Sequence, residues 1–402
     1  MGMKKPFWKF CEPKKSYDAL IIGGGLHGMA AAYYLARDYG MTNLAVLEKN
    51  RFGYGGSSRN TEIIRANQRA PEILPLYVQS IQLWNELSAE VEWNFMIWMK
   101  GLIGLAHTVA GLNSMRMRHA TQTNLGIENH ILTPEELKKL IPFLDISSRA
   151  AIPVVGGYYH PPGGSVRHDA AIWGFMKGLY RQGVHLCPDC EVTGINIDHG
   201  RVTGVRAKVG GSETTISAPL VHMAPGGWSS EVAAMAGITL PVVTLPLQAM
   251  VTECVKPFLN HVVISELYFC YCQQSIKGDL IMGAHLDPWQ SYKSYNTYEF
   301  ASEQAYFILQ LFPDLAHLKL MRSWSGLCDM TVDGAPIMGE LPVKGLFIDA
   351  GWGYFGFKAS TACGKNMAEL MATGEMPEKI RFLSMDRFYE GRMVPEVYIA
   401  RS

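Results

Sequence analysis

The N-terminal part of the chain alternates between short hydrophobic runs and small or polar residues. Residues 18–22 (DALII) form an apolar run with the length and composition of a buried parallel strand. A glycine-rich turn follows, and then a stretch of small residues, 29–38, that predicts a helix. Residues 42–47 (TNLAVL) predict a second strand, which ends at Glu48. This order predicts a strand–helix–strand unit of about thirty residues, the length that such a unit needs.

The rest of the chain predicts a mixture of helices and strands. Residues 134–140 predict a helix with Thr133 as N-cap, Pro134 at its first position and Glu136 at its third, which together form a capping box. The hydrophobic pattern further predicts helices at 72–90, 169–183 and 300–311, a hairpin at 192–197 and 201–208, an antiparallel sheet within 240–282, and a strand at 345–350. No repeat or linker separates these segments, so two interleaved domains are expected.

The glycines of the first unit form a recognisable pattern. Gly23, Gly25 and Gly28 follow the predicted strand and open the predicted helix, and Glu48 lies 20 residues beyond the last glycine. In a dinucleotide-binding unit the first glycine makes the turn, the second lets the backbone approach a pyrophosphate, and the third lets the helix pack on the strand. The helix N-terminus adds N–H donors and positive potential, and the acidic residue accepts hydrogen bonds from a ribose. The pattern predicts a dinucleotide site but leaves FAD and NAD both open.

Composition narrows the classes of function. The 402 residues are 48% hydrophobic and 18% charged, with 36 basic and 36 acidic side chains. A disordered chain is excluded, and neither nucleic acid nor a membrane surface is an expected partner, because there is no basic excess. The charged fraction lies below the roughly 25% of typical domains. Either a large partner interface or a large core explains this deficit.

Cysteine usage and the chain's start bear on its location. Eight cysteines in a chain of this length do not indicate a disulfide framework, and Cys187 and Cys190 form a lone C-x-x-C that favours ordinary thiols over a redox or metal site. We therefore expect no metal. The basic start lacks an apolar region after it, and no apolar run reaches ~18 residues, so neither a signal peptide nor a spanning helix is expected. These features predict a cytoplasmic protein.

Two further stretches carry candidate chemistry. Residues 349–358 (DAGWGYFGFK) join a strand end to a helix through a glycine-rich loop, and Lys358 is the one basic residue within it. Residues 55–65 (GGSSRNTEIIR) are rich in small polar side chains, and Arg65 offers a planar fork for a carboxylate. Lys358 could also be a surface lysine, and Arg59 and Arg65 could be surface ion pairs.

These segments together resemble the FAD-dependent amine oxidases of the D-amino-acid-oxidase and sarcosine-oxidase group. Within the group, the chain most resembles the beta subunits of the heterotetrameric sarcosine oxidases. The likeness runs almost end to end and includes VLEK (46–49), GGSVRHD (163–169), PLQA (246–249) and the Lys358 loop. It implies an α/β fold in which a Rossmann-type FAD-binding domain is interleaved with an α+β substrate domain. The expected FAD-binding domain comprises residues 15–90, 150–230 and 322–385, the substrate domain residues 91–149 and 231–321, and a C-terminal tail residues 386–402.

The resemblance also implies two flavins. FAD is expected to bind noncovalently through residues of the segments above: Gly23, Gly25, His27, Gly28, Glu48, Lys49, Gly56, Arg59, Asn60, Thr61, Val192, Gly351, Gly353, Gly356 and Lys358. FMN is expected at the interface with a larger alpha-type subunit, bonded covalently to His168, with Arg167 and Arg322 at its phosphate. From its position alone, His168 is a histidine near the start of a predicted helix. The resemblance further implies that NAD and tetrahydrofolate bind in a partner subunit and that small subunits complete the hetero-oligomer.

The implied reaction is the oxidation of a secondary N-methyl amino acid. Hydride passes to FAD and leaves an imine, electrons pass to FMN and then to oxygen, and the one-carbon unit leaves as formaldehyde or passes to tetrahydrofolate. Arg65 and Lys358 are expected to bind the substrate carboxylate. Tyr271 matches an aromatic residue of the substrate region, although an inward-facing strand tyrosine explains it equally. A dehydrogenase subunit for proline, N-methylglutamate or glycine that passes electrons to another acceptor, and a non-catalytic electron-transfer subunit, are the alternatives.

The chain departs from the family pattern at two places in the expected FAD site. Relatives that bond FAD to a cysteine carry it at the position of Gly326, and the nearest cysteine here, Cys328, lies two residues further on. We therefore expect no covalent bond to FAD. The second departure is Pro225, which lies in a loop (APGGW, 224–228) that is usually rich in alanine and glycine.

Overall fold

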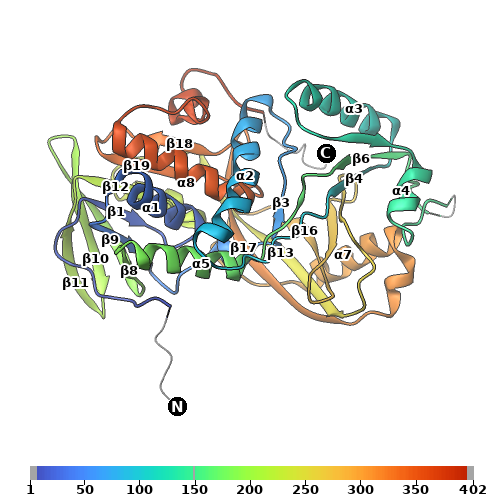
Figure 1. Ribbon diagram of the computed structural model, residues 1–402, viewed down its shortest axis with the longest axis horizontal. Coiled ribbons are helices and arrows are strands. Elements are labelled where there is room, and N and C mark those ends of the chain that lie inside the picture. Colours follow the sequence, from blue (N-terminus) through green and yellow to red (C-terminus); the bar gives the residue numbers. More distant parts are fainter. Residues whose placement is uncertain (1–6, 148–149, 396–402) are drawn as a thin grey trace, which may run out of the picture.

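The molecule consists of two sheets that lie beside each other, with helices on their outer faces (Figure 1). The computed structural model describes residues 7–147 and 150–395. The end of the expected C-terminal tail, residues 396–402, lies outside this range. Within the described residues, no helix is both long and apolar enough to cross a membrane.

The first sheet is built around the predicted strand–helix–strand unit. Its six strands have the order β18-β19-β12-β1-β2-β8, and all are parallel except β18 at one edge. Their bounds are β1 (Ala19–Ile22), β2 (Leu44–Leu47), β8 (His185–Cys187), β12 (Leu220–Met223), β18 (Ile337–Glu340) and β19 (Leu346–Ala350). Because β2 lies on one side of β1 and β12 on the other, the strand order reverses at β1, where open parallel sheets form their crevice.

Helices cover one face of this sheet, and a smaller sheet covers the other. The helical face carries α1 (Leu26–Tyr39), α2 (Leu74–Glu90), α5 (His168–Arg181) and α8 (Gly356–Thr373). A Cβ atom at Gly364 of α8 would lie 2.4 Å from the Cβ of Ala30, so α1 and α8 cross at very close range. The opposite face carries the antiparallel β9 (Cys190–Asp198), β10 (Arg201–Val209) and β11 (Ser212–Ser217), with α6 (Ser229–Ala234) beside them.

The second sheet has eight strands in the order β17-β13-β16-β15-β14-β4-β6-β5. Neighbouring strands are antiparallel except β14 and β4. Their bounds are β4 (Leu102–Ala106), β5 (His130–Leu132), β6 (Gly156–His160), β13 (Val242–Cys254), β14 (Val262–Ser265), β15 (Cys270–Gln274), β16 (Asp279–Leu286) and β17 (Leu320–Thr331). Helix α7 (Tyr298–Leu311) packs on one face, with Phe300 buried against Met250 and Met282. The opposite face is turned toward the first sheet.

Short elements complete the second half. Helix α3 (Val109–Asn124) packs beside β4, β5 and β6, and α4 (Pro134–Leu140) has the predicted capping box of Thr133 and Glu136. The two-residue strands β3 (Ile63–Ile64) and β7 (Gly164–Ser165) pair antiparallel. This pairing brings the segment before Arg65 next to the segment before Arg167.

The structure confirms the interleaved architecture and most of the predicted elements. The first helix is longer than expected, because it begins at Leu26 within the glycine motif. The domain division stays a prediction, but the sheets cut across it. Strand β6 and residues 322–331 of β17 belong to the second sheet, although the predicted FAD-binding domain includes 150–230 and 322–385. The expected tail also begins inside the fold, since Arg387 is buried against Asp333.

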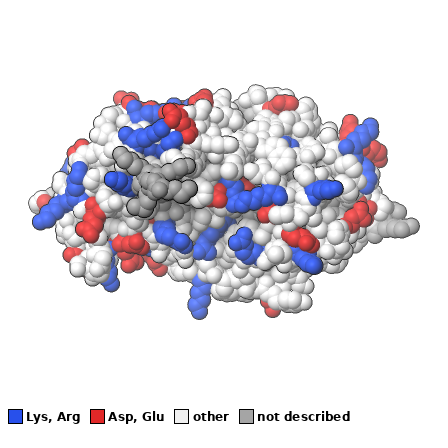
Figure 2. All heavy atoms as spheres, turned by 60° about the horizontal axis from the view of Figure 1, so that its bottom comes forward, with Lys and Arg blue, Asp and Glu red and all other residues white. Residues whose placement is uncertain are grey.

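The surface is sparsely charged, as the composition requires. On the face drawn in Figure 2, basic and acidic side chains are interspersed, and wide areas carry neither.

Candidate active site

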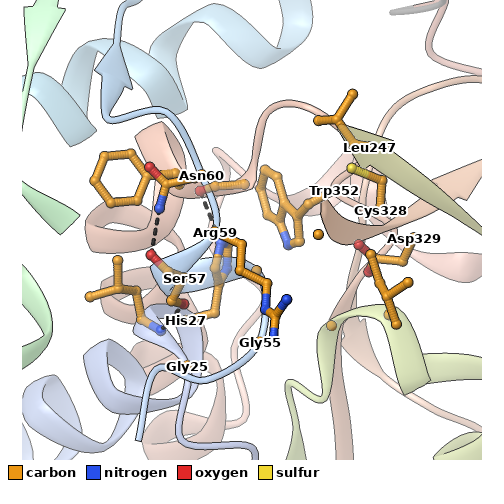
Figure 3. A pocket seen from close by; sticks show the side chains of 18 of the residues that line it. Gly25, His27, Gly55, Ser57, Arg59, Asn60, Leu247, Cys328, Asp329 and Trp352 are labelled. Atoms are coloured by element: carbon orange, nitrogen blue, oxygen red, sulfur yellow. Dashed lines mark hydrogen bonds between the residues drawn. The ribbon is translucent and has the colours of Figure 1, made fainter. Parts of the chain in front are cut away.

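A long pocket lies between the first sheet and the inner face of the second. It runs from the glycine turn after β1, past the ends of β2, β9 and β12, to the N-terminus of α8. Figure 3 shows that the glycine turn (Gly25, His27), the loop after β2 (Ser57, Arg59, Asn60) and the C-terminal half (Cys328, Asp329, Trp352) face one another across it. Three distant parts of the sequence therefore build one site.

The glycines of the turn have separate tasks. A Cβ atom at Gly23 would lie 2.3 Å from the carbonyl oxygen of Ala224, and one at Gly28 would lie 2.1 Å from the carbonyl oxygen of Gly23. Gly25 is different, because its added Cβ would meet only the Oγ of Ser57, at 3.1 Å. Gly25 is also the N-cap of α1 and offers no side chain as a cap, and the helix terminus faces the pocket with its positive potential.

The carboxylate at the end of β2 is held by backbone groups. Glu48 accepts hydrogen bonds from the N–H of Gly24 at 2.8 Å and of Asn50 at 2.9 Å, and it lines the pocket. Burial raises the pKa of Glu48, although these N–H groups act against that rise. Lys49 lies with its Nζ 3.5 Å from the ring centre of Trp228, in the loop that contains the unexpected Pro225.

His27 joins the two ends of the chain at the pocket. Its Nδ1 lies 2.9 Å from Asp349 and its Nε2 lies 2.9 Å from the carbonyl oxygen of Gly356. Burial lowers the pKa of His27, but the Asp349 carboxylate outweighs burial, so the pKa is raised. Because both ring nitrogens face acceptors, this contact favours the imidazolium form. The indole N–H of Trp352 donates to the same carboxylate.

The loop after β2 contributes polar atoms and is tied to the second sheet. The Oγ of Ser57 accepts a hydrogen bond from the N–H of Leu26 at 2.9 Å. Arg59 donates to the carbonyl oxygens of Tyr54 at 3.0 Å and Ser325 at 2.9 Å, so it pairs with backbone rather than with a surface carboxylate. Gly56, Asn60 and Thr61 line the pocket beside it.

Arg65 and Lys358 meet at one aromatic ring. The guanidinium carbon of Arg65 lies 5.6 Å from the ring centre of Phe355, and the Nζ of Lys358 lies 5.3 Å from it. Both cations are buried and line the pocket, with Arg65 also 2.6 Å from the Oδ1 of Asn67 and Lys358 2.9 Å from the carbonyl oxygen of Tyr354. The surface alternatives for both residues are therefore wrong.

The wall formed by the second sheet contains Tyr271 and the segment of the expected cysteine change. Tyr271 lines the pocket with Thr61 at its hydroxyl group, and burial raises its pKa. Gly326 and Cys328 of β17 both reach the pocket, and burial raises the pKa of the Cys328 thiol, which keeps it protonated. Next to it, burial raises the pKa of Asp329 to about 6.

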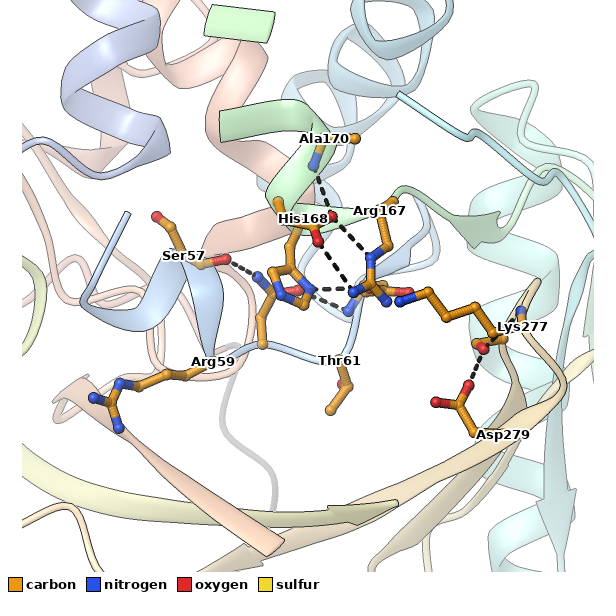
Figure 4. A network of polar contacts seen from close by, with 12 residues as sticks. Ser57, Arg59, Thr61, Arg167, His168, Ala170, Lys277 and Asp279 are labelled. Atoms are coloured by element: carbon orange, nitrogen blue, oxygen red, sulfur yellow. Dashed lines mark hydrogen bonds and ion pairs between the residues drawn. The ribbon is translucent and has the colours of Figure 1, made fainter. Parts of the chain in front are cut away.

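The histidine singled out for FMN lies beside the loop after β2, at the start of α5 (His168–Arg181). His168 is the first residue of α5, and its side chain is 18% exposed. Its Nδ1 lies 3.0 Å from the Oε1 of Glu62, and the same oxygen lies 3.0 Å from Nη1 of Arg167 (Figure 4). Arg167 also binds Asp169 through two hydrogen bonds, so a phosphate at this guanidinium competes with two carboxylates. Arg322 is exposed on β17, and no ion pair joins it to another described residue.

Most of the candidate residues come together and a few do not. The pocket is lined by Gly23, Gly25, His27, Glu48, Lys49, Gly56, Arg59, Asn60, Thr61, Arg65, Val192, Tyr271, Gly353, Gly356 and Lys358. Outside its lining lie Gly28, Gly351, Arg167, His168 and Arg322. Sequence analysis missed Ser57, Glu62 and Asp329. Ser57 and Glu62 lie in the polar segment 55–65, but nothing in the pattern distinguishes them from their neighbours.

The fold and the site define a flavin enzyme. A sequence model of the family described as "FAD dependent oxidoreductase" matches residues 18–370, so the chain belongs to this family. The N-terminus of α1 with glycine as its N-cap, the small-residue turn before it and the carboxylate at the end of β2 fit the dinucleotide part of FAD. The glycine fingerprint left FAD and NAD both open, and the family match decides in favour of FAD.

Individual relatives show which members of the family this chain resembles. The chain is 39% identical to the sarcosine oxidase subunit beta of Rhizobium meliloti (strain 1021) over 97% of this chain and 93% of the relative. It is 38% identical to the subunit of the same name from an Arthrobacter species, over 97% and 95%. The structure of L-proline dehydrogenase from P. horikoshii superposes with a TM-score of 0.87 at 27% identity, covering 94% of this chain and 99% of that one. The expected resemblance to the beta subunits and the expected fold class are confirmed.

Proposed function

We propose that this chain oxidises a secondary N-methyl amino acid, sarcosine or a close analogue, as the beta-type subunit of a hetero-oligomer. The observation that carries the proposal is that one pocket combines an FAD cradle with two buried cations, Arg65 and Lys358, at the ring of Phe355. Such a pair fits an amino acid carboxylate. The identities of 39% and 38% to beta subunits, over 97% of the chain, support the choice of substrate class.

In this proposal the protein binds and orients, and FAD supplies the hydride acceptor. Arg65 and Lys358 fix the carboxylate of the substrate and so hold its N-methyl group at a constant position. Tyr271 closes the side of the pocket formed by the second sheet. FAD stays noncovalent, because Gly326 provides no nucleophile and the Cys328 thiol is kept protonated.

The second flavin is proposed to be FMN bonded to His168. The surroundings of this histidine fit a ligand held partly by another subunit, because its side chain is 18% exposed. The second sheet carries exposed apolar side chains, among them Ile276 (52%) in the turn between β15 and β16 and Met321 (65%) on β17. This surface is where we expect the larger alpha-type subunit, with NAD, tetrahydrofolate and the small subunits further away from this chain. When bound, the FMN takes electrons from FAD and passes them to oxygen.

A second candidate function rests on the structural likeness to L-proline dehydrogenase, at a TM-score of 0.87. In that case the chain is a dehydrogenase subunit for proline, N-methylglutamate or glycine that passes electrons to an acceptor other than oxygen. A purely electron-transferring subunit is disfavoured, because it has no use for a buried Arg65 and Lys358 at the FAD pocket.

One experiment separates these functions. The chain is produced together with its partner subunits, and oxygen uptake and dye reduction are measured with sarcosine, N-methylglutamate, proline and glycine. Oxygen uptake with sarcosine as the best substrate supports the proposal, whereas dye reduction without oxygen uptake supports the dehydrogenase.

A second measurement tests the covalent FMN. The same preparation is precipitated with acid, and the mass of the chain is measured by mass spectrometry. An added mass of one FMN that is lost in His168→Ala, while extractable FAD remains, supports the second flavin. Fully extractable flavin rejects it.

A further inference from the structure

A buried glutamate separates the FAD pocket from His168. Glu62 lines the pocket, and only 5% of its side chain is exposed. Its Oε1 lies 3.0 Å from the Nδ1 of His168 and 3.0 Å from the Nη1 of Arg167. Figure 4 shows this carboxylate between the histidine ring and the guanidinium. Among the described residues, neither the Nδ1 of His168 nor the Oε1 of Glu62 has a hydrogen-bond partner, so the two buried atoms face each other as an ion-pair contact only.

The backbone holds Glu62 in an unusual conformation. Its φ angle is +68°, in the left-handed region that a residue with a Cβ atom rarely adopts. The N–H of Glu62 donates to the Oδ1 of Asn60 at 2.7 Å, and its carbonyl oxygen accepts from the N–H of Val166 at 2.9 Å. Strained residues of this kind persist where the surroundings fix them, and they occur preferentially at functional sites. The second of these bonds ties Glu62 to the segment that carries His168.

We propose that Glu62 is the positioning residue that prepares His168 for covalent attachment to FMN. The proposal rests on the two-flavin function given above. The 3.0 Å contact becomes a hydrogen bond when the ring turns its Nδ1–H toward Glu62, and His168 then keeps a lone pair on Nε2, as a histidine oriented by a carboxylate does in catalytic triads. Attachment forms a bond between Nε2 and the 8α carbon of the flavin and breaks one C–H bond of the 8α methyl group. The Nδ1 proton passes to Glu62 and from there to dioxygen, which also takes the proton of the 8α carbon and the two electrons and leaves as hydrogen peroxide.

The test compares covalent attachment in matched variants of the whole complex. The complex is made without flavin, FMN is added in air, and the mass of the chain is followed over time at several pH values. Glu62→Gln keeps the shape but cannot accept a proton, so attachment is expected to slow at least tenfold at neutral pH and to recover at higher pH, where solvent takes the proton. Glu92→Gln is the matched control: Glu92 also has a positive φ, of +49°, and pairs with Arg181 at 2.7 Å, but it is 69% exposed.

The outcomes distinguish the inference from the proposed function. If the wild-type chain never gains the mass of FMN, the two-flavin function fails and the role of Glu62 fails with it. If wild type and Glu62→Gln attach FMN at the same rate with the same pH profile, the function stands and the role of Glu62 is overturned. If Glu62→Gln loses FAD or melts at a lower temperature, Glu62→Asp decides. Recovery of attachment in the aspartate variant supports a carboxylate role, and its absence with normal FAD content refutes it.

Discussion

The two glycines Gly25 and Gly28 offer a direct test of how the FAD site is built. Gly28→Ala adds a Cβ 2.1 Å from the carbonyl oxygen of Gly23, about 1 Å inside the closest distance that carbon and oxygen tolerate, and both atoms belong to backbone. Relieving the clash requires α1 to move away from β1. Overpacking of this kind costs about 1–3 kcal/mol or more, and we expect the melting temperature of the flavin-free chain to fall by a few degrees.

Gly25→Val is expected to act on FAD and not on the fold. Its φ of −79° suits a residue with a side chain, and its added Cβ meets only the flexible Ser57 hydroxyl. The valine side chain instead occupies the place where the backbone approaches the pyrophosphate. Melting curves with and without added FAD, together with the flavin content of the purified protein, give the comparison: Gly25→Val should retain the flavin-free melting temperature and less than a tenth of the flavin. Wild-type flavin content in Gly25→Val, or a wild-type melting temperature in Gly28→Ala, would refute the reasoning.

Three further predictions concern other parts of the molecule. Arg65→Ala and Lys358→Met should each lower kcat/KM for a carboxylate substrate ten- to over a hundredfold, mainly by raising KM, because each removes a charge-assisted hydrogen bond worth about 1.5–3 kcal/mol. Unchanged steady-state constants would show that the two cations do not bind the carboxylate. Arg387→Met should destabilise the chain by about 3–5 kcal/mol in denaturant titrations, because Asp333 is left buried without its partner; an unchanged midpoint contradicts this. Burial lowers the pKa of His222 from its usual 6.5 to about 4, so the unfolded chain binds the proton first and stability falls as the pH drops from 6.5 to 4. His222→Leu should remove about 3 kcal/mol of that fall, seen as a flatter dependence of unfolding on pH.

Local patterns in the sequence predicted the fold where the structure is itself local. The unit from β1 to β2 and the capping box at Thr133 both follow from residues within a few turns of each other. Strand β17 was missed over its whole length, since its sequence (LMRSWSGLCDMT) lacks the alternation of a half-buried strand. Helix α3 was missed for a similar reason: of its residues only Met115 and Gln122 are buried, so it has no apolar stripe to detect.

The candidate site divides in the same way. The glycine fingerprint predicted the FAD cradle, because turn, helix and acidic residue follow one another along the chain. The contacts that complete the site join residues far apart, such as His27 with Asp349 and Arg65 with the ring of Phe355. The role proposed for Glu62 depends on the pairing of β3 with β7, two strands of two residues each that no periodicity can reveal.

The contact between His27 and Asp349 has a consequence for how the protein is made. The two residues are 322 positions apart, and β19 and α8, which complete the first sheet and its helical layer, come from the same late part of the chain. At about 5–20 residues per second, a ribosome needs roughly 15–65 s to reach Asp349 after it has added His27. During that time the glycine turn after β1 lacks Asp349 and the N-terminus of α8, which form the other side of the pocket. Flavin loading is therefore expected after translation of the C-terminal strands, and nascent chains that stop before Asp349 should be recovered without FAD.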